Sequence, residues 1–172
     1  MRNEGGHKKR MVIREALAAD FDDIASCVFA AFENSAEVTL VRQLRADKDV
    51  LAEWVAQEVD SIVGHVMVSK MTLDPDLAVR CGGVAPLSVT PTHQSCGIGS
   101  RLMKTVLAHS RSLDLDALFL LGDPAYYYRF GFQVTGVHSD YPAEYFQAYE
   151  LRPGCLRGPE VKALYARAFA SL

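Results

Sequence analysis

The chain contains none of the features that mark membrane, secreted or nucleic-acid-binding proteins. No apolar run reaches the roughly 18 residues that a membrane-spanning helix needs. The formal net charge is −3, which argues against nucleic acid or an anionic membrane as a partner. The four cysteines form no Cys-x-x-Cys pair, and no His, Cys and Asp residues stand at metal-ligand spacing. Neither a disulfide framework nor a metal site is expected, and we predict a cytoplasmic protein with reduced cysteines.

The first ten residues, MRNEGGHKKR, are basic, but they are not followed by the apolar segment of a signal peptide. We expect residues 1–10 to be a disordered lead-in, and Met11 could itself be the natural start. The chain has the composition of a soluble globular protein, with 49% apolar and 23% charged residues. Residues 11–172 suffice for one domain, which at this size buries roughly 70% of the surface of the unfolded chain.

The most informative stretch is LSVTPTHQSCGIGSR, residues 87–101. It predicts an apolar strand ending at Val89, a turn at Pro91, a polar loop with two glycines, and then a helix. The first N–H groups of such a helix have no internal partner, and with the helix dipole they favour a phosphate or pyrophosphate. Taken alone, the glycine pair is equally typical of a tight turn before a helix. The apolar face of the predicted helix comprises Ile98, Leu102, Met103, Val106 and Leu107.

Two common phosphate-binding loops do not match this stretch. A P-loop needs Gly-Lys-Ser/Thr, and no lysine follows Gly99. A dinucleotide-binding fingerprint needs a third glycine where Leu102 stands. The stretch instead resembles motif A of the GNAT family of acyl-CoA-dependent N-acyltransferases, Gln/Arg-x-x-Gly-x-Gly/Ala, whose positions are filled by Gln94, Gly97 and Gly99.

The rest of the chain alternates between helical and strand periodicity. A predicted hairpin is followed by a loop bracketed by Pro75 and by Gly82-Gly83. The last segment has high helix propensity, but the resemblance implies a strand there, and we favour the strand. The predicted strands are 11–14, 51–58, 62–69, 85–89, 117–121, 132–134, 148–151 and 161–165, and the predicted helices are 18–32, 35–46, one from residue 98, and a short one between Pro124 and Gly131.

This order of elements is that of the GNAT family over nearly the whole chain from Met11. A second local match is a tyrosine shortly before a Gly-Phe pair, because Tyr127 stands five residues before Phe132. The surrounding sequence resembles a bacterial branch of mostly uncharacterised predicted acetyltransferases. The resemblance implies an α/β fold with a mixed, mostly antiparallel central sheet and helices on both faces. In this fold the fourth and fifth strands are parallel and splay apart.

The resemblance also implies acetyl-CoA as cosubstrate and a primary amine of a small molecule as acceptor. The N–H of Val89 would contact the thioester carbonyl, with Leu87 and Ser88 beside the pantetheine arm. Tyr127 would protonate the leaving sulfur as general acid, although tyrosines on a short helix are also typical of packing. The implied acetyl-CoA contacts are Leu87, Ser88, Val89, Gln94, Ser95, Cys96, Gly97, Ile98, Gly99, Ser100 and Tyr127.

A general base is harder to assign. Glu33, in the loop between the first two helices, is the candidate we favour, and Asp123, at the end of a buried strand, is the alternative. Both are also typical of capping or turn residues. The remaining polar residues receive structural interpretations: a helix cap for Ser35, a half-buried strand position for His65, and solvated positions for Arg42 and Arg45.

The acceptor is the least defined part of the prediction. It would be contacted by the loop between the first two helices and by residues 74–83 and 137–147. Two other functions remain open: a protein lysine or N-terminal acetyltransferase, and a non-catalytic acyl-CoA-binding sensor. The sequence does not distinguish acetyl from a longer acyl group, or a monomer from a homodimer. The polar side chains of the last two segments include Asp76, Arg80, His138, Asp140, Tyr141 and Tyr145.

Overall fold

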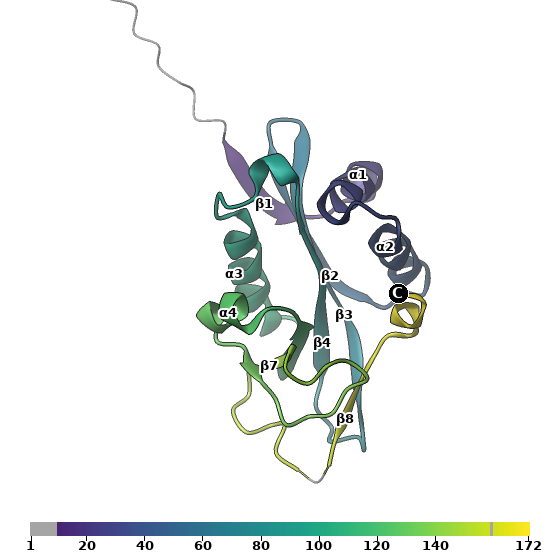
Figure 1. The fold of residues 1–172 in the computed structure, drawn as a ribbon, viewed down its shortest axis with the longest axis vertical. Coiled ribbons are helices and arrows are strands. Elements are labelled where there is room, and N and C mark those ends of the chain that lie inside the picture. The colour runs from purple at the N-terminus through teal and green to yellow at the C-terminus, as the bar shows by residue number, and fades with distance from the viewer. Residues whose placement is uncertain (1–9, 159) are drawn as a thin grey trace, which may run out of the picture.

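The computed structural model describes residues 10–158 and 160–172, so nearly all of the predicted lead-in at 1–10 lies outside the described residues. An open sheet runs through the molecule, with α1 and α2 on one face and α3 on the other (Figure 1). The strands are β1 Met11–Glu15, β2 Val50–Glu58, β3 Ser61–Asp74, β4 Cys81–Val89, β5 Ala117–Leu121, β6 Gln133–Val134, β7 Phe146–Glu150 and β8 Lys162–Tyr165. The helices are α1 Phe21–Phe32, α2 Ala36–Ala46, α3 Ile98–Ser110 and α4 Pro124–Tyr127.

The predicted fold class is confirmed by the sheet topology. The strand order is β1-β2-β3-β4-β5-β7-β6, and β8 pairs with the far end of β3. All of these pairs are antiparallel except β4 with β5. The sheet is therefore mixed and mostly antiparallel, with a single parallel pair at its centre among the described strands.

The parallel strands β4 and β5 splay apart. They pair only where Cys81–Gly83 meet Ala117–Phe119, although β4 continues to Val89. A register shift against β3 falls between Val84 and Leu87 of β4, which is the sign of a β-bulge. The last residues of β4 therefore have β3 on one side and no strand on the other.

Each face of the sheet has its own apolar packing. The predicted stripe of α3 is buried, since Ile98, Leu102, Met103 and Val106 all join the core cluster on that side. On the opposite face α1 and α2 pack through separate clusters, and the C-terminal turn Arg167–Ser171 lies against α2. None of the helices among the described residues has the length and apolarity needed to cross a bilayer.

The predicted loop at Gly82-Gly83 is wrong, because both glycines lie inside β4. A Cβ on Gly82 would stand 2.8 Å from Cγ1 of Val68, and a Cβ on Gly83 would stand 2.9 Å from a ring carbon of Tyr165. The glycines therefore let neighbouring side chains pack directly on the strand backbone, and they do not mark a turn. Because its far end pairs with the start of β4 and with β8, β3 extends to Asp74, five residues beyond its predicted end at Ser69.

Two terminal features also differ in detail from prediction. The C-terminal strand is confirmed as Lys162–Tyr165, since pairing with β3 overrides the local helix propensity. At the start of α2 the capping side chain is Asn34, whose Oδ1 accepts from the N–H of Ala36 at 2.8 Å. Ser35 occupies the predicted N-cap position, but its side chain makes no capping hydrogen bond.

Candidate active site

The glycine loop between β4 and α3 has the conformation of an anion site. Gly97 has φ +82°, and a Cβ there would meet nothing within 4 Å, so glycine is favoured by the backbone angle alone. The first bond of α3 runs from the N–H of Arg101 to the carbonyl of Gly97. The N–H groups of Ile98, Gly99 and Ser100 therefore have no partner within the helix.

This loop, the end of β4 and the tyrosine run at α4 surround a hollow of about 630 Å³, called here the loop hollow. Most of the predicted acetyl-CoA contacts line it. His93, Tyr126 and Arg129 also line it and were missed from the sequence. The predicted contacts in its lining are Leu87, Val89, Gln94, Ser95, Gly97, Ile98, Gly99 and Ser100.

Tertiary contacts bring the missed residues Tyr126 and Arg129 to the loop hollow. A Cβ on Gly99 would stand 2.9 Å from Oη of Tyr126, so glycine at this position allows the tyrosine to lie on the first turn of α3. The exposed guanidinium of Arg129 lies 4.6 Å from the centre of the Tyr126 ring, which is a cation–π arrangement. Tyr126 was visible in the sequence only as one of three consecutive tyrosines, and nothing in the motif pointed to Arg129.

Three predicted contacts lie outside the loop hollow. Ser88 is buried and, by strand alternation, faces away from the side of Leu87 and Val89. Cys96 is exposed and absent from the lining of the hollow. Tyr127 lines a neighbouring cavity instead.

The end of β4 offers one backbone donor toward the splayed side. The N–H of Thr90 donates to the carbonyl of Val63 on β3 at 2.9 Å. Successive N–H groups of an extended strand point to opposite sides, so the N–H of Val89 points away from β3, where β5 no longer pairs. The side chain of Gln94 donates to the carbonyl of Val89 at 3.1 Å, which ties the glycine loop to this strand end.

A second cavity, of about 330 Å³, adjoins the loop hollow and is called here the aromatic cavity. Leu87 lines both, so the two meet at the end of β4. Most of its wall is aromatic or aliphatic, and it is assembled from α1, α2, β4, β5, α4, β8 and the C-terminal turn. Its lining residues are Phe32, Glu37, Leu40, Val84, Ala85, Pro86, Leu87, Leu121, Tyr127, Tyr141, Tyr165, Phe169 and Leu172.

Tyr127 is held in the aromatic cavity by the turn before α4. A Cβ on Gly122 would stand 2.4 Å from a ring carbon of Tyr127, so only glycine leaves room for the ring. Asp123 caps α4, its Oδ1 accepting from the N–H of Ala125 at 2.9 Å. Burial raises the pKa of Tyr127 to about 12, so the hydroxyl keeps its proton at neutral pH. Asp123 thus has the capping role that was its structural alternative.

The two glutamates at the α1–α2 connection have different environments. Glu33 ends α1 with φ +57°, is exposed, and does not line the aromatic cavity. Glu37, in the first turn of α2, does line it. Its Oε2 is buried and has no hydrogen-bond partner among the described residues. Glu37 was missed from the sequence because an acid in the first turn of a helix is ordinarily explained by the helix dipole. The signal that could have found it is its place on the same face as the buried residues Leu40, Val41 and Leu44.

A buried ionic cluster supports α2 from the sheet. Glu53 on β2 accepts hydrogen bonds from Arg45 on α2 and from Nε2 of His65 on β3, the latter at 2.7 Å. The prediction of a half-buried His65 is wrong because its side chain is fully buried, and Arg45 is not solvated, since its guanidinium also stacks 3.7 Å from the Phe21 ring centre. These positions follow from charges meeting across three elements, which periodicity does not reveal.

The protonation states in this cluster follow from its burial. Burial lowers the pKa of His65, so the ring is neutral at neutral pH and donates its Nε2 proton. Although burial alone would raise it, the pKa of Glu53 is held below its ordinary value by hydrogen bonds from His65 and Arg45. The cluster thus contains one carboxylate paired directly with one guanidinium, and a neutral ring that donates to the same carboxylate.

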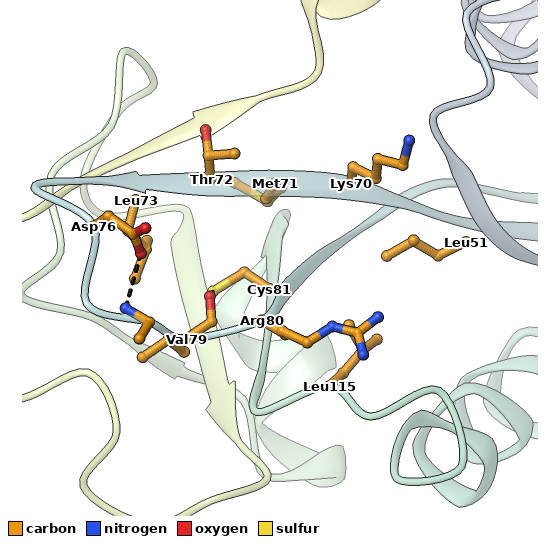
Figure 2. A pocket seen from close by; sticks show the side chains of 11 residues that line it. Leu51, Lys70, Met71, Thr72, Leu73, Asp76, Val79, Arg80, Cys81 and Leu115 are labelled. Carbon is orange, nitrogen blue, oxygen red and sulfur yellow. Dashed lines mark hydrogen bonds between the residues drawn. The ribbon is translucent and has the colours of Figure 1, made fainter.

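A third hollow, also about 630 Å³, lies at the far end of β3 and contains no predicted donor-site or catalytic residue. Figure 2 shows Asp76 turned back on its own loop, where Oδ1 accepts from the N–H of Ala78 at 2.8 Å. Arg80 pairs with Asp114 and Lys70 with Asp49. Asp76 and Arg80, predicted near the acceptor, therefore lie in a separate hollow from Tyr127. No group of three or more potential metal ligands occurs among residues 10–158 and 160–172.

Comparison with known proteins bears directly on this geometry. A family model described as an acetyltransferase (GNAT) domain matches residues 12–135. The uncharacterised N-acetyltransferase YjhQ of Escherichia coli K12 is 32% identical over 130 residues, covering 74% of this chain and 72% of YjhQ.

Two crystal structures resemble the whole fold. The E. coli GNAT protein YhbS, in complex with CoA, has a TM-score of 0.87 at 28% identity over 94% of this chain and 92% of its own. A GNAT acetyltransferase from Brucella melitensis, in complex with acetyl-CoA, has a TM-score of 0.80 at 31% identity over 94% and 99%. The splayed parallel strands, the glycine loop at the start of α3 and these matches agree that this chain belongs to the GNAT family and is an N-acetyltransferase.

Proposed function

We propose that the protein transfers the acetyl group of acetyl-CoA to the primary amine of a small molecule, by direct attack of the amine on the thioester. The observation that carries this proposal is the junction of the loop hollow and the aromatic cavity at Leu87. If the thioester of acetyl-CoA lies beside Leu87, the phosphates of the CoA would reach the glycine loop and the acetyl group would lie at the mouth of the aromatic cavity. The CoA and acetyl-CoA complexes of the two structural relatives support this donor.

The donor site suits a pyrophosphate for two physical reasons. The N–H groups of Ile98, Gly99 and Ser100 lie at the positive end of the thirteen-residue helix α3. The exposed guanidinium of Arg129, beside the Tyr126 ring, adds a positive charge to the lining of the hollow. Cys96 need not contact the ligand through its thiol, since backbone groups supply the donors in this loop.

The reaction forms a C–N bond and breaks the C–S bond of the thioester. The acceptor ammonium would first lose a proton to water, and the neutral amine would attack the thioester carbon to give a tetrahedral intermediate. The C–S bond then breaks to release the CoA thiolate, and the second proton that leaves the nitrogen replaces, through water, the one that Tyr127 gives to the sulfur. The N–H of Val89, free on the splayed side, would donate to the carbonyl oxygen as negative charge develops there. Tyr127 would supply the proton that the leaving sulfur takes up, because its raised pKa keeps the hydroxyl protonated.

The dimensions of the aromatic cavity favour a small acceptor over a polypeptide. Ligand pockets span roughly 300–1,000 Å³, and this cavity of about 330 Å³ stands at the small end. A protein acetyltransferase needs an open peptide groove on the acceptor side. The third possibility, a non-catalytic acyl-CoA sensor, would not need a protonated tyrosine beside the thioester.

The proposal is tested by measuring acetyl-CoA binding and acetyl transfer separately. We expect acetyl-CoA to raise the melting temperature, and a panel of small primary amines to release free CoA thiol with acetyl-CoA present. Absence of acetyl-CoA binding contradicts the proposal. Binding without transfer to any amine supports the sensor, and transfer to lysine peptides in preference to small amines supports the protein acetyltransferase.

A further inference from the structure

We infer that the aromatic cavity selects a monoamine on a small uncharged apolar or aromatic body, with the Glu37 carboxylate and the Tyr165 hydroxyl contacting the acceptor. This inference rests on the proposed acetyl transfer and specifies the acceptor class. It is carried by two unpartnered buried polar atoms, by the charges that line the cavity, and by the shape and chemistry of its walls.

Two polar atoms in this cavity are buried without a hydrogen-bond partner among the described residues: Oε2 of Glu37 and Oη of Tyr165. Buried polar groups in native proteins nearly always have a hydrogen-bond partner. Two such atoms without partners in the lining of one cavity therefore indicate a ligand that supplies the missing hydrogen bonds. Burial also raises the pKa of Tyr165, so its hydroxyl remains protonated and can donate as well as accept. A primary ammonium, with three donors, matches the Glu37 carboxylate.

The charges that line the cavity restrict the rest of the acceptor. Glu37 carries the only charged side chain among the described residues that line it. With no lysine or arginine in the lining, a carboxylate or phosphate on the acceptor would be desolvated without a partner. With no second acidic side chain, the far ammonium of a polyamine would also be unpaired. The preferred acceptor therefore has one amine and no other charge.

The walls suit an apolar or aromatic body. Tyr165 is central to them: its ring lies 4.7 Å from that of Phe169 and 5.4 Å from that of Tyr141, the latter edge-on. Phe32 and Tyr127 complete the aromatic lining. Aromatic side chains bind flat apolar groups through large contact areas, and a nearby ring face also favours a cation.

Glu37 is held on a rigid element. Asn34 caps the start of α2, and the buried residues Leu40, Val41 and Leu44, which follow Glu37 on the same face of the helix, pack α2 against the rest of the protein. An acid in the first turn is favoured by the helix dipole. Acetylation removes the positive charge of the amine, so the neutral amide loses its ionic partner at Glu37. Product should therefore bind more weakly than substrate.

The test compares acceptors that differ by one charged group, in the acetyl-CoA-dependent thiol-release assay. We expect 2-phenylethylamine to exceed phenylalanine, which adds a carboxylate, and spermidine, which adds ammonium groups, by at least about tenfold in kcat/KM. Glu37→Gln should raise the KM for 2-phenylethylamine about 10- to 100-fold, the range expected for a charge-assisted hydrogen bond, and leave the Kd of acetyl-CoA unchanged. Glu37→Asp should restore part of the loss, and Tyr165→Phe should give a smaller increase.

The matched control is Glu15→Gln, the same change at an exposed glutamate on β1, which should alter neither constant. Melting temperatures of all variants separate misfolding from lost recognition. Failure of acetyl-CoA to bind contradicts the proposed function. If acetyl-CoA binds and some amine is acetylated, the inference alone is overturned by a preference for phenylalanine or spermidine, by an unchanged KM in Glu37→Gln, or by failure of every neutral-bodied amine to react.

Discussion

The loop hollow and the aromatic cavity adjoin at Leu87, yet they are built in opposite ways. The loop hollow is formed mainly by one continuous stretch, residues 87–100, and offers backbone N–H groups. The aromatic cavity has four lining residues from β4, but it takes the others one or two at a time from α1, α2, β5, α4, the loop before β7, β8 and the C-terminal end, which are far apart in the chain. The proposed donor half of the site therefore depends on local backbone conformation, and the proposed acceptor half depends on how remote elements pack.

The largest expected effect on the acceptor half comes from a residue outside its lining, the Glu53 carboxylate that Arg45 of α2 binds. Glu53→Gln leaves Arg45 without its carboxylate partner in a buried setting, and we expect the free energy of unfolding to fall by about 3–5 kcal/mol. Urea unfolding measures the change. Because Arg45 links α2 to the sheet, the KM of the amine should rise more than the Kd of acetyl-CoA does.

The control for this variant is again Glu15→Gln, which removes a carboxylate from an exposed position. A loss of stability under about 1 kcal/mol in Glu53→Gln would show that the cluster does not hold α2. An equal rise in the KM of the amine and the Kd of acetyl-CoA would show that the two halves of the site depend on the same packing of α2.

Removing the hydroxyl of Tyr127 in the aromatic cavity should slow acetyl transfer without weakening acetyl-CoA binding. In Tyr127→Phe the hydroxyl that would protonate the thiolate is lost while the packing of the ring is kept, so we expect kcat to fall about 100-fold, the low end of the range for general acid catalysis. The Kd of acetyl-CoA, measured by isothermal titration, should stay the same. A kcat within about threefold of the unmodified protein would leave Tyr127 with a packing role only.

The donor half is tested by the backbone angle at Gly97. Gly97→Ala places a Cβ at φ +82°, where a non-glycine residue costs about 1–2 kcal/mol, although no atom lies in its way. If the loop shifts to relieve this strain, the Kd of acetyl-CoA should rise about tenfold with little change in the KM of the amine. Gly136→Ala is the matched control, because a Cβ there also meets nothing but the backbone angle is not left-handed. Equal binding by both variants would contradict the role of the left-handed turn.

The smallest expected effect is the loss of stability in acid that comes from the Arg14–Asp20 ion pair just before α1. The hydrogen bonds from Arg14 hold the pKa of Asp20 at about 2, below its value in the unfolded chain. The lowered pKa stabilises the fold above about pH 4, and this contribution is lost as the pH falls toward 2. Solvent screening limits the effect to about 1 kcal/mol. Unfolding titrations should show that this part of the acid sensitivity disappears in Asp20→Asn, and an unchanged profile would rule it out.

Most of the fold could be predicted because its elements carry their own periodicity. The stripe of α3, the strand predicted at 117–121 and the short helix predicted from Pro124 follow from local patterns, and the structure has each in its predicted place. The wrong predictions concern residues whose structure depends on contacts with other elements of the fold. Gly82 and Gly83 belong to β4 because Val68, Met71 and Tyr165 pack over them, and His65 is fully buried because it donates to Glu53.

The sequence by itself determined the donor half of this protein: a strand end, a glycine loop and a helix start lie within fifteen residues, and neighbouring backbone groups can bind a phosphate wherever that segment folds. Only the tertiary structure decided the acceptor half. Glu37, Tyr141 and Tyr165 lie on three segments with no shared motif, and they line one cavity only because β8 pairs with β3 and α2 packs on the sheet. A backbone site needs a local conformation, whereas a cavity of side chains needs the whole fold.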